Sequence, residues 1–259
     1  MNGRVLVVAG SDSGGGAGIQ ADIKAIMAMD GYSATAITAI TAQNTLGVHA
    51  VLPVPIPLVR AQIEAVLDDI GADAIKTGML GDAAMIAAIA DEIERRARTI
   101  PLVVDPVMVA KGGAPLLADS AIYTLRTRLL PLATLITPNL PEAAALLGHP
   151  INDPVEAATA LRALAPAVLL KGGHGEGPIV RDILAHPDGL EIFESERIET
   201  RHTHGTGCTL ASAIAAGLAQ GMGLIDSVRR ARNYVAAAIR AAPGYGAGHG
   251  PLNHNVQAP

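Results

Sequence analysis

Short runs of apolar and β-branched residues alternate with longer Ala-, Leu- and Ile-rich segments along this chain, and that alternation restricts the fold more than any other feature. The short runs predict strands at residues 5–9, 34–40, 72–78, 101–106, 133–139 and 167–173. They are continuously apolar, which is typical of strands covered on both faces. The longer segments predict helices, including residues 59–70, 83–97 and 156–164. This order predicts an α/β fold with a mostly parallel central sheet between two helical layers.

Two further runs, at residues 179–186 and 190–198, flank the turn sequence Pro187-Asp188-Gly189. This pattern predicts a pair of antiparallel strands at one edge of the sheet. No linker, repeat or low-complexity segment divides the 259 residues. A single domain over residues 1–259 is therefore expected.

The composition disfavours several classes of function. The net charge is −5, there is no Trp and only one Phe, so neither a basic surface nor aromatic stacking platforms for nucleic acid are expected. The single Cys cannot form an internal disulfide, which fits a reducing compartment. The apolar run from Val5 to Gly10 is too short for a signal-peptide core or a membrane span. We expect a cytoplasmic protein without nucleic-acid or membrane partners.

Ligands in parallel α/β sheets bind beyond the carboxyl ends of the strands. Each predicted strand of the central sheet is followed by polar or glycine-rich residues, namely GSDSGGGAG, TAQNT, KTGML, DPVM, TPNLPE and KGGHG. We expect the functional site to be assembled from these six segments together with HGTGC, residues 204–208.

Residues 16–21 match the dinucleotide-binding pattern G-x-G-x-x-A, but the match is weak. The glycines come too late after Ala9 for a tight strand-to-helix turn, and no acidic residue lies between Gly31 and Ile63 to bind a ribose. A flexible loop with a helix from about Gly18, or a loop that folds over a small substrate, fits equally well. A P-loop is absent because Ile75, rather than Gly, precedes Lys76.

The HGTGC segment has two interpretations. The backbone N–H groups of residues 205–208 could form an anion cradle at the start of a helix, strengthened by the helix dipole. Alternatively, the segment is an ordinary glycine-rich turn with Thr206 as the helix N-cap and Cys208 as a buried structural thiol. The motif alone does not separate these interpretations.

Charged side chains follow three of the predicted strands. Asn139 and Glu142 flank Pro141 at a helix start, where such residues are expected for structural reasons, although they could also hold hydrated magnesium. Asp105 lies at another strand end and has no helix of its own to cap. Lys171 is either an edge lysine in solvent or a cation directed at phosphate.

The ordered set of segments resembles the hydroxymethylpyrimidine/phosphomethylpyrimidine kinases, a thiamine-biosynthesis branch of the ribokinase-like superfamily. The resemblance extends from about residue 4 to residue 254. It rests on GSDSGGGAGIQADIK, TAQNT, KTGML, VVDPVMVAKGG, LITPNLPEAAALL, LLKGGH, RHTHGTGCT and GHGPLNH. Each motif alone is modest, but their order is specific. The family usually has KIGML where this chain has KTGML, so Thr77 is a mild departure.

The resemblance implies a ribokinase-like three-layer α/β/α sandwich, usually a homodimer. It also implies ATP-dependent, Mg²⁺-dependent phosphorylation of 4-amino-5-hydroxymethyl-2-methylpyrimidine, followed by a second phosphorylation of the monophosphate to the diphosphate. A small pyrimidine and ATP are thus the expected partners.

The resemblance also implies roles for individual residues. Gln43 would hydrogen-bond the aminopyrimidine edge, in a pocket lined by Gly10, Ala17, Met79 and Val107. Magnesium and its waters would be organised by Asp105, Asn139 and Glu142. The ATP phosphates would be contacted by Lys171 and Thr206, with Asp105 beside them.

At the HGTGC segment, the resemblance implies that the amides of Gly205, Thr206 and Gly207 form an anion hole. Most sugar kinases of the superfamily have Asp at the position of Cys208, where it acts as a base. A helix N-terminus lowers the pKa of a thiol, so Cys208 is expected to take the hydroxymethyl proton as a thiolate.

Three alternatives stay open at this point. The nearest is a pyridoxal or pyridoxine kinase, or an enzyme that accepts both alcohols. A catalytically silent pyrimidine-binding protein is disfavoured by the intact phosphate-site residues Asp105, Glu142, Lys171 and Cys208. An NAD-dependent oxidoreductase is a distant third.

Overall fold

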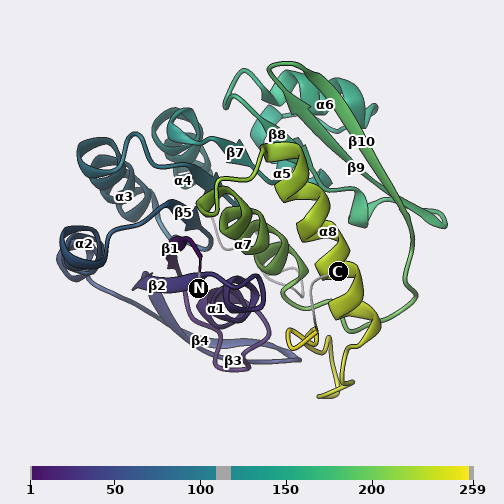
Figure 1. The fold of residues 1–259 in the computed structure, drawn as a ribbon, viewed down its shortest axis with the longest axis horizontal. Helices are drawn as coiled ribbons and strands as arrows, with labels where there is room; N and C mark the ends of the chain where they lie inside the picture. The colour runs from purple at the N-terminus through teal and green to yellow at the C-terminus, as the bar shows by residue number, and fades with distance from the viewer. Residues whose placement is uncertain (1, 109–117, 257–259) are drawn as a thin grey trace.

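The core of the molecule is a twisted sheet that contains eight strands within the described part of the chain (Figure 1). The computed structural model describes residues 2–108 and 118–256, so residues 109–113 of the VVDPVMVAKGG motif lie outside it. The strands lie in the order β10 (Gly189–Glu196), β9 (Ile179–His186), β8 (Val168–Leu170), β7 (Leu135–Ile136), β6 (Leu102–Val104), β5 (Ala74–Thr77), β1 (Arg4–Ala9) and β2 (Tyr32–Ile37). All pairs from β8 to β2 are parallel, whereas β9 is antiparallel to both of its neighbours. The predicted parallel sheet with an antiparallel edge is confirmed.

Helices cover both faces of the sheet because the side chains of its strands alternate between two apolar clusters. On β1, Val5 and Val7 face one cluster, and Leu6 and Val8 face the other. The first face is covered by α1 (Gly18–Ala28), α7 (Thr206–Ala219) and α8 (Leu224–Arg240). The second is covered by α2 (Ile56–Ala65), α3 (Ala83–Arg96), α4 (Asp119–Thr124), α5 (Leu140–Leu147) and α6 (Pro154–Leu161). The three-layer sandwich is thereby confirmed.

Single-turn helical segments complete the described elements. Two π-helical segments follow α2 and α4, at Val66–Ile70 and Leu125–Leu129. Two 3₁₀ segments span Leu130–Leu132 and Gly172–His174. None of the helices in the described ranges is long and apolar enough to cross a membrane.

The strand predicted over residues 34–40 is wrong in its second half. The central strand β2 ends at Ile37, and a separate ribbon forms from β3 (Ala39–Asn44) and β4 (Gly47–Pro53). Thr38 is the junction between them: its N–H continues the β1–β2 ladder by donating to Ala9 O, whereas its carbonyl accepts from Val54 N, the residue after β4. Its hydroxyl donates to Met79 O. The TAQNT segment consequently ends a strand of this ribbon rather than a strand of the central sheet.

Candidate active site

A cavity of about 1160 Å³ lies at the carboxyl edge of the sheet. The cavity lies beside β1, which has β2 on one side and β5 on the other. The strand order reverses direction there, and α/β sheets commonly bind ligands at such a topological switch point. The cavity is lined by every residue to which the sequence resemblance assigns a role. These are Gly10, Ala17, Gln43, Met79, Asp105, Val107, Asn139, Glu142, Lys171, Gly205, Thr206, Gly207 and Cys208.

Lys171 lies between two acidic side chains in this cavity. Its Nζ is 2.9 Å from Asp105 Oδ1 and 3.9 Å from Glu142 Oε2. The Thr137 hydroxyl donates to the same Asp105 oxygen over 3.0 Å. The Lys171 side chain is only 14% exposed, so the alternative of an edge lysine in solvent is excluded.

The surroundings give the two carboxyl groups different pKa values. Burial raises the pKa of Glu142 to about 7, although the charge of Lys171 acts in the opposite direction. Burial also opposes ionisation of Asp105, but Lys171 and Lys76 outweigh it and lower the pKa of that carboxyl. At neutral pH, Asp105 is therefore ionised while Glu142 is near its midpoint.

Asn139 and Glu142 form a capping box at the start of α5. Asn139 Oδ1 accepts from Glu142 N over 2.9 Å, and Glu142 Oε2 accepts from Asn139 N over 2.8 Å. The structural role foreseen for these two residues is confirmed. It still leaves acceptor capacity on both side chains toward the cavity, since each oxygen has more than one lone pair.

The acidic residues suit a magnesium ion that also binds waters and phosphates better than they suit a metal ion that is bound by protein ligands alone. Within residues 2–108 and 118–256, no group of three or more His, Cys, Asp and Glu side chains could hold an ion. Magnesium usually keeps several waters and takes one or two carboxylates together with substrate phosphates. Asp105 and Glu142, both almost fully buried beside Lys171, match that requirement.

The HGTGC segment starts α7, and Gly205 is its N-cap with φ +84°. A side chain at Gly205 would collide with Gly16 O, so the close contact between the two glycine-rich loops requires glycine there. The prediction of Thr206 as the N-cap is wrong, because Thr206 is already the first residue of the helix. Its hydroxyl donates to Thr203 O over 2.8 Å. Its amide also donates to that carbonyl, over 3.3 Å.

The first-turn amides of Gly207 and Cys208 have no acceptor within their own helix. Gly207 is also next to Lys171, since a Cβ placed on it would be 3.2 Å from Lys171 Nζ. Of the first-turn amides, those of Gly207 and Cys208 are therefore more available to an anion than that of Thr206.

Cys208 does not have the lowered pKa expected from its position at a helix start. Burial raises the pKa of its thiol to about 11, and the opposing effects of Lys76 and of a hydrogen bond from the Gly18 backbone are smaller. The expectation of a thiolate is therefore wrong for the unliganded protein. Desolvation of the sulfur outweighs the helix dipole because the dipole supplies only a partial charge.

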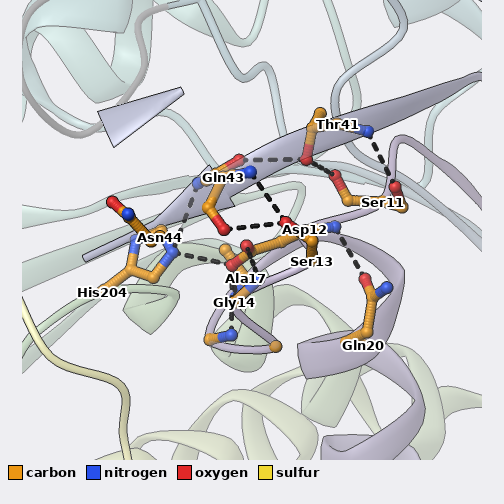
Figure 2. Close-up of polar contacts among 12 residues, drawn as sticks. Ser11, Asp12, Ser13, Gly14, Ala17, Gln20, Thr41, Gln43, Asn44 and His204 are labelled. Atoms are coloured by element: carbon orange, nitrogen blue, oxygen red, sulfur yellow. Dashed lines mark hydrogen bonds and ion pairs between the residues drawn. The ribbon is translucent and has the colours of Figure 1, made fainter. Parts of the chain in front are cut away.

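Sequence reasoning missed a buried pair of residues that line the cavity near Gln43. His204 Nε2 is 2.8 Å from Asp12 Oδ2, and both side chains are almost completely buried (Figure 2). The close-up also shows Gln43 next to them, with its side-chain nitrogen 3.4 Å from the same His204 nitrogen. Asp12 and His204 belong to the GSDSGGGAG and HGTGC segments, so a polar residue within each glycine-rich loop was the available signal.

Sequence reasoning also missed the residues that hold the Lys171 loop. Asp182, on β9, accepts from Gly172 N over 2.8 Å and from Arg232 Nε over 2.7 Å. Arg232 comes from α8, and it lines the cavity beside Asn233. No sequence motif marks this contact, because β9 and α8 are 50 residues apart at the bonded pair.

Comparison with known proteins identifies relatives of the whole chain. The family model described as phosphomethylpyrimidine kinase matches residues 12–253. A hydroxymethylpyrimidine/phosphomethylpyrimidine kinase of Streptomyces coelicolor is 48% identical over 96% of this chain and 93% of its own length. The thiamine biosynthesis bifunctional protein ThiED of Geobacter sulfurreducens is 50% identical over 99% of this chain, which spans 53% of that longer relative.

The fold also matches a solved enzyme structure. The ADP complex of Bacillus subtilis pyridoxal kinase superposes with a TM-score of 0.90 and 38% sequence identity, covering 98% of each chain.

Proposed function

The chain belongs to the phosphomethylpyrimidine kinase family, and from that premise we propose that it phosphorylates 4-amino-5-hydroxymethyl-2-methylpyrimidine and then the resulting monophosphate. ATP is the phosphoryl donor, and the product is the pyrimidine diphosphate used in thiamine biosynthesis. The observation that best supports this proposal is the position of Lys171 beside Asp105, Glu142 and the Gly207 turn. A cation, two carboxylates and a helix start together suit a magnesium–triphosphate group.

The substrate half of the cavity suits a small heteroaromatic alcohol. Gln43 offers both a donor and an acceptor to a ring edge. Gly10, Ala17, Met79 and Val107 line the cavity with small or apolar groups. The ring thus lies between the two glycine-rich loops and the β3–β4 ribbon, with its hydroxymethyl group toward Cys208.

In the first phosphorylation, the hydroxymethyl oxygen attacks the γ-phosphorus of ATP. The bond from that phosphorus to the bridging β–γ oxygen breaks, and ADP leaves. Cys208 takes the hydroxymethyl proton as its thiolate, which is the minor form at neutral pH because the pKa of the thiol is raised to about 11. Lys171 and the amides of Gly207 and Cys208 stabilise the charge on the transferring group.

Asp105, Asn139 and Glu142 are the residues that would hold magnesium and its waters in this reaction. A magnesium ion held by these residues would supply neutralisation of the negative charge that develops on the β- and γ-phosphates. Asp105 needs no proton loss to take part, since its pKa is lowered. Glu142, with its pKa near 7, takes part in its ionised form.

Pyridoxal is the second candidate substrate, favoured by the close match to the Bacillus subtilis pyridoxal kinase structure. An experiment with the full chain, ATP and magnesium distinguishes the candidates. Each alcohol is incubated separately, and the products are identified by mass spectrometry. Sequential mono- and diphosphorylation of the pyrimidine is expected. Phosphorylation of pyridoxal alone would overturn the assignment.

We also propose that the protein is a cytoplasmic homodimer. The β3–β4 ribbon supports the assembly, because it exposes Leu46, Leu52 and Ile40 by 68%, 65% and 52%. Apolar surface of this kind is often covered by a partner subunit. Sedimentation equilibrium of the chain and of a Leu52→Glu variant tests the assembly, with the variant expected to shift toward monomer. A monomeric parent would contradict it.

A further inference from the structure

The Asp12 carboxyl accepts hydrogen bonds from backbone amides of its own glycine-rich loop and contacts His204 in the substrate half of the cavity. One of its oxygens accepts from Gly14 N over 2.8 Å. The other, Oδ2, accepts from Ala17 N over 2.8 Å and from Gly16 N over 3.1 Å. Burial opposes its ionisation, but the hydrogen bonds from His204 and the loop amides outweigh it and lower the pKa of Asp12. The carboxylate is therefore ionised and can only accept hydrogen bonds.

An ionised Asp12 determines the proton position on His204. His204 Nε2 is 2.8 Å from Asp12 Oδ2, a distance at which two acceptors would repel each other. Nε2 must therefore carry the hydrogen and donate it to Asp12. It then has no lone pair left to accept a hydrogen bond from Gln43.

The neighbours of Gln43 identify the orientation of its amide. With Nε2 of Gln43 3.4 Å from His204 Nε2, two donors face one another. On the other side, Gln43 Oε1 is 3.5 Å from Thr41 Oγ1, whose one hydrogen already goes to Ser11 O over 2.9 Å. Two acceptors therefore face one another there. Rotation of the amide by half a turn turns the Thr41 contact into a hydrogen bond and places the Gln43 oxygen against His204 Nε2–H, whose one hydrogen it then shares with Asp12.

The backbone of Gln43 is held independently of its side chain. Ser13 Oγ donates to Gln43 O over 2.7 Å, and Gln43 N lies 2.7 Å from the same hydroxyl oxygen (Figure 2). The side-chain torsions of Gln43 can therefore change while its backbone stays in place.

We propose that Asp12 and His204 are positioning residues that orient the Gln43 amide, with its oxygen toward His204 and its nitrogen toward Thr41, and that this orientation selects a 4-aminopyrimidine edge. The proposal rests on the function proposed above and assigns the origin of its substrate selectivity. Asp12 acts on the Gln43 amide through His204, and the two residues position that amide without a substrate contact of their own being required.

The oriented amide leaves one acceptor on Oε1 and one donor on Nε2 for the ligand. A 4-aminopyrimidine carries its amino group next to a ring nitrogen, so one edge offers a matching donor and acceptor. Pyridoxal carries its hydroxyl on a carbon that is not adjacent to the ring nitrogen, and it cannot make both bonds at once. An amide held in one orientation therefore favours the pyrimidine, whereas a freely rotating amide accepts either alcohol.

The first test measures the affinity of the full chain for each alcohol by calorimetry without ATP. His204→Ala is expected to weaken pyrimidine binding about tenfold, the typical effect of one lost buried hydrogen bond, and pyridoxal binding much less. His204→Gln, which keeps a donor, should restore much of the loss. The KM for MgATP should be unchanged in both variants. His249→Ala is the matched control, because His249 lines the same cavity but lies 3.1 Å from Arg201 O, and it should retain parental affinities.

A double-mutant cycle separates positioning from a general structural effect. In a Gln43→Ala background, His204→Ala should weaken pyrimidine binding no further, because there is no amide left to orient. An equal loss in both backgrounds, or equal losses for the two alcohols, would overturn the proposal.

The second test needs neither ligand nor variant, so it is independent of the proposed function. In the unliganded protein, NMR cross-peaks from the Gln43 side-chain amide protons should be stronger to the Thr41 methyl group than to the His204 ring. The reverse pattern would overturn the orientation. A parent protein that phosphorylates no aminopyrimidine would instead overturn the proposed function and leave the orientation standing.

Discussion

Lys76 Nζ lies 2.7 Å from Asp22 Oδ1, and neither side chain is exposed to solvent. The Ser212 hydroxyl donates to the same oxygen over 2.7 Å, so the pair joins β5, α1 and α7 at the cavity, which Lys76 helps to line. Lys76→Met would leave the Asp22 carboxylate buried without its cation. We expect this variant to lose about 3–5 kcal/mol of unfolding free energy, measured by urea denaturation.

A double variant provides the control for this buried ion pair. Asp22→Asn combined with Lys76→Met removes both charges, and it should recover a large part of the stability lost in the single variant. Losses that simply add would show that the two residues do not act as a pair.

The role of Cys208 can be tested by comparing the two phosphorylations in one variant. The first removes a proton from an alcohol, whereas the monophosphate, with a second pKa of about 6, already presents an ionised oxygen. Cys208→Ala should therefore lower turnover of the alcohol by roughly 10²–10⁴-fold and affect the monophosphate much less. Steady-state assays on each substrate measure this. Equal losses on both substrates would argue against a base.

The raised pKa of Cys208 also predicts a pH profile. Because only the thiolate accepts a proton, turnover of the alcohol should rise with pH toward the pKa of about 11, and Cys208→Ala should lack this rise. A parent profile that is flat above neutral pH would contradict the thiolate as the base.

Glu142 should determine how tightly the protein uses magnesium. With its pKa raised to about 7 in the folded protein, acid protonates this carboxyl, so the apparent magnesium affinity should increase as the pH rises through that value. Glu142→Gln should lower magnesium affinity, remove this pH dependence and be partly rescued by excess magnesium. Magnesium titrations of turnover at several pH values provide the measurement.

Asp153 offers a matched control for Glu142. Its side chain caps α6 through Val155 N and Glu156 N, so it shares the helix-start role but is not among the residues that line the cavity. Asp153→Asn should therefore cost only stability. Magnesium curves of Glu142→Gln that superimpose on the parent curves would remove Glu142 from the proposed metal site.

Thr77 should be a point at which the protein can be stabilised. Its hydroxyl is buried and has no hydrogen-bond partner within the described ranges. Thr77→Val keeps the shape and removes the unsatisfied group, so the free energy of unfolding should rise by about 1–2 kcal/mol. Thr137→Val is the control, since the Thr137 hydroxyl donates to Asp105 and its loss should destabilise. A destabilised Thr77→Val protein would show that the hydroxyl has a partner in solution.

His254 should make the protein sensitive to acid. Burial lowers the pKa of this histidine from 6.5 to about 4, whereas the unfolded chain retains the ordinary value. Between these two pH values the unfolded state binds a proton that the folded state does not, so stability falls as the pH falls. His254→Gln, which can still bond Thr209, should lose less stability on acidification. Urea denaturation at about pH 7 and about pH 4.5 checks this, and parallel losses would exclude His254 as the cause.

Local signals in the sequence were enough for the elements that depend on near neighbours. The edge hairpin was predicted because its turn and both strands are contiguous, and β9 has the predicted bounds Ile179–His186. The strand over residues 34–40 was misplaced because the continuous apolar run contains no break signal. At its end, Thr38 bonds to Ala9, Met79 and Val54, none of which is a near neighbour in sequence.

In the candidate site, too, some features were predicted from the sequence and others depended on the tertiary structure. The strand-end rule and the family resemblance predicted which segments would meet, and their thirteen assigned residues do line one cavity. They could not predict protonation, because the pKa of Cys208 depends on how deeply its sulfur is desolvated. The helix dipole can be inferred from sequence position, but the burial that outweighs it cannot.

By itself, therefore, the sequence determined the α/β class, the mostly parallel direction of the strands and most of the loops at the carboxyl edge of the sheet, since strand, helix and turn preferences act over a few residues. Only the tertiary structure decided that Asp12 contacts His204 and that His204 contacts Gln43, across 192 and 161 residues of chain. Such contacts arise when whole layers pack together. Their effects on hydrogen positions and charge depend on distances of a fraction of an ångström, which no local pattern encodes.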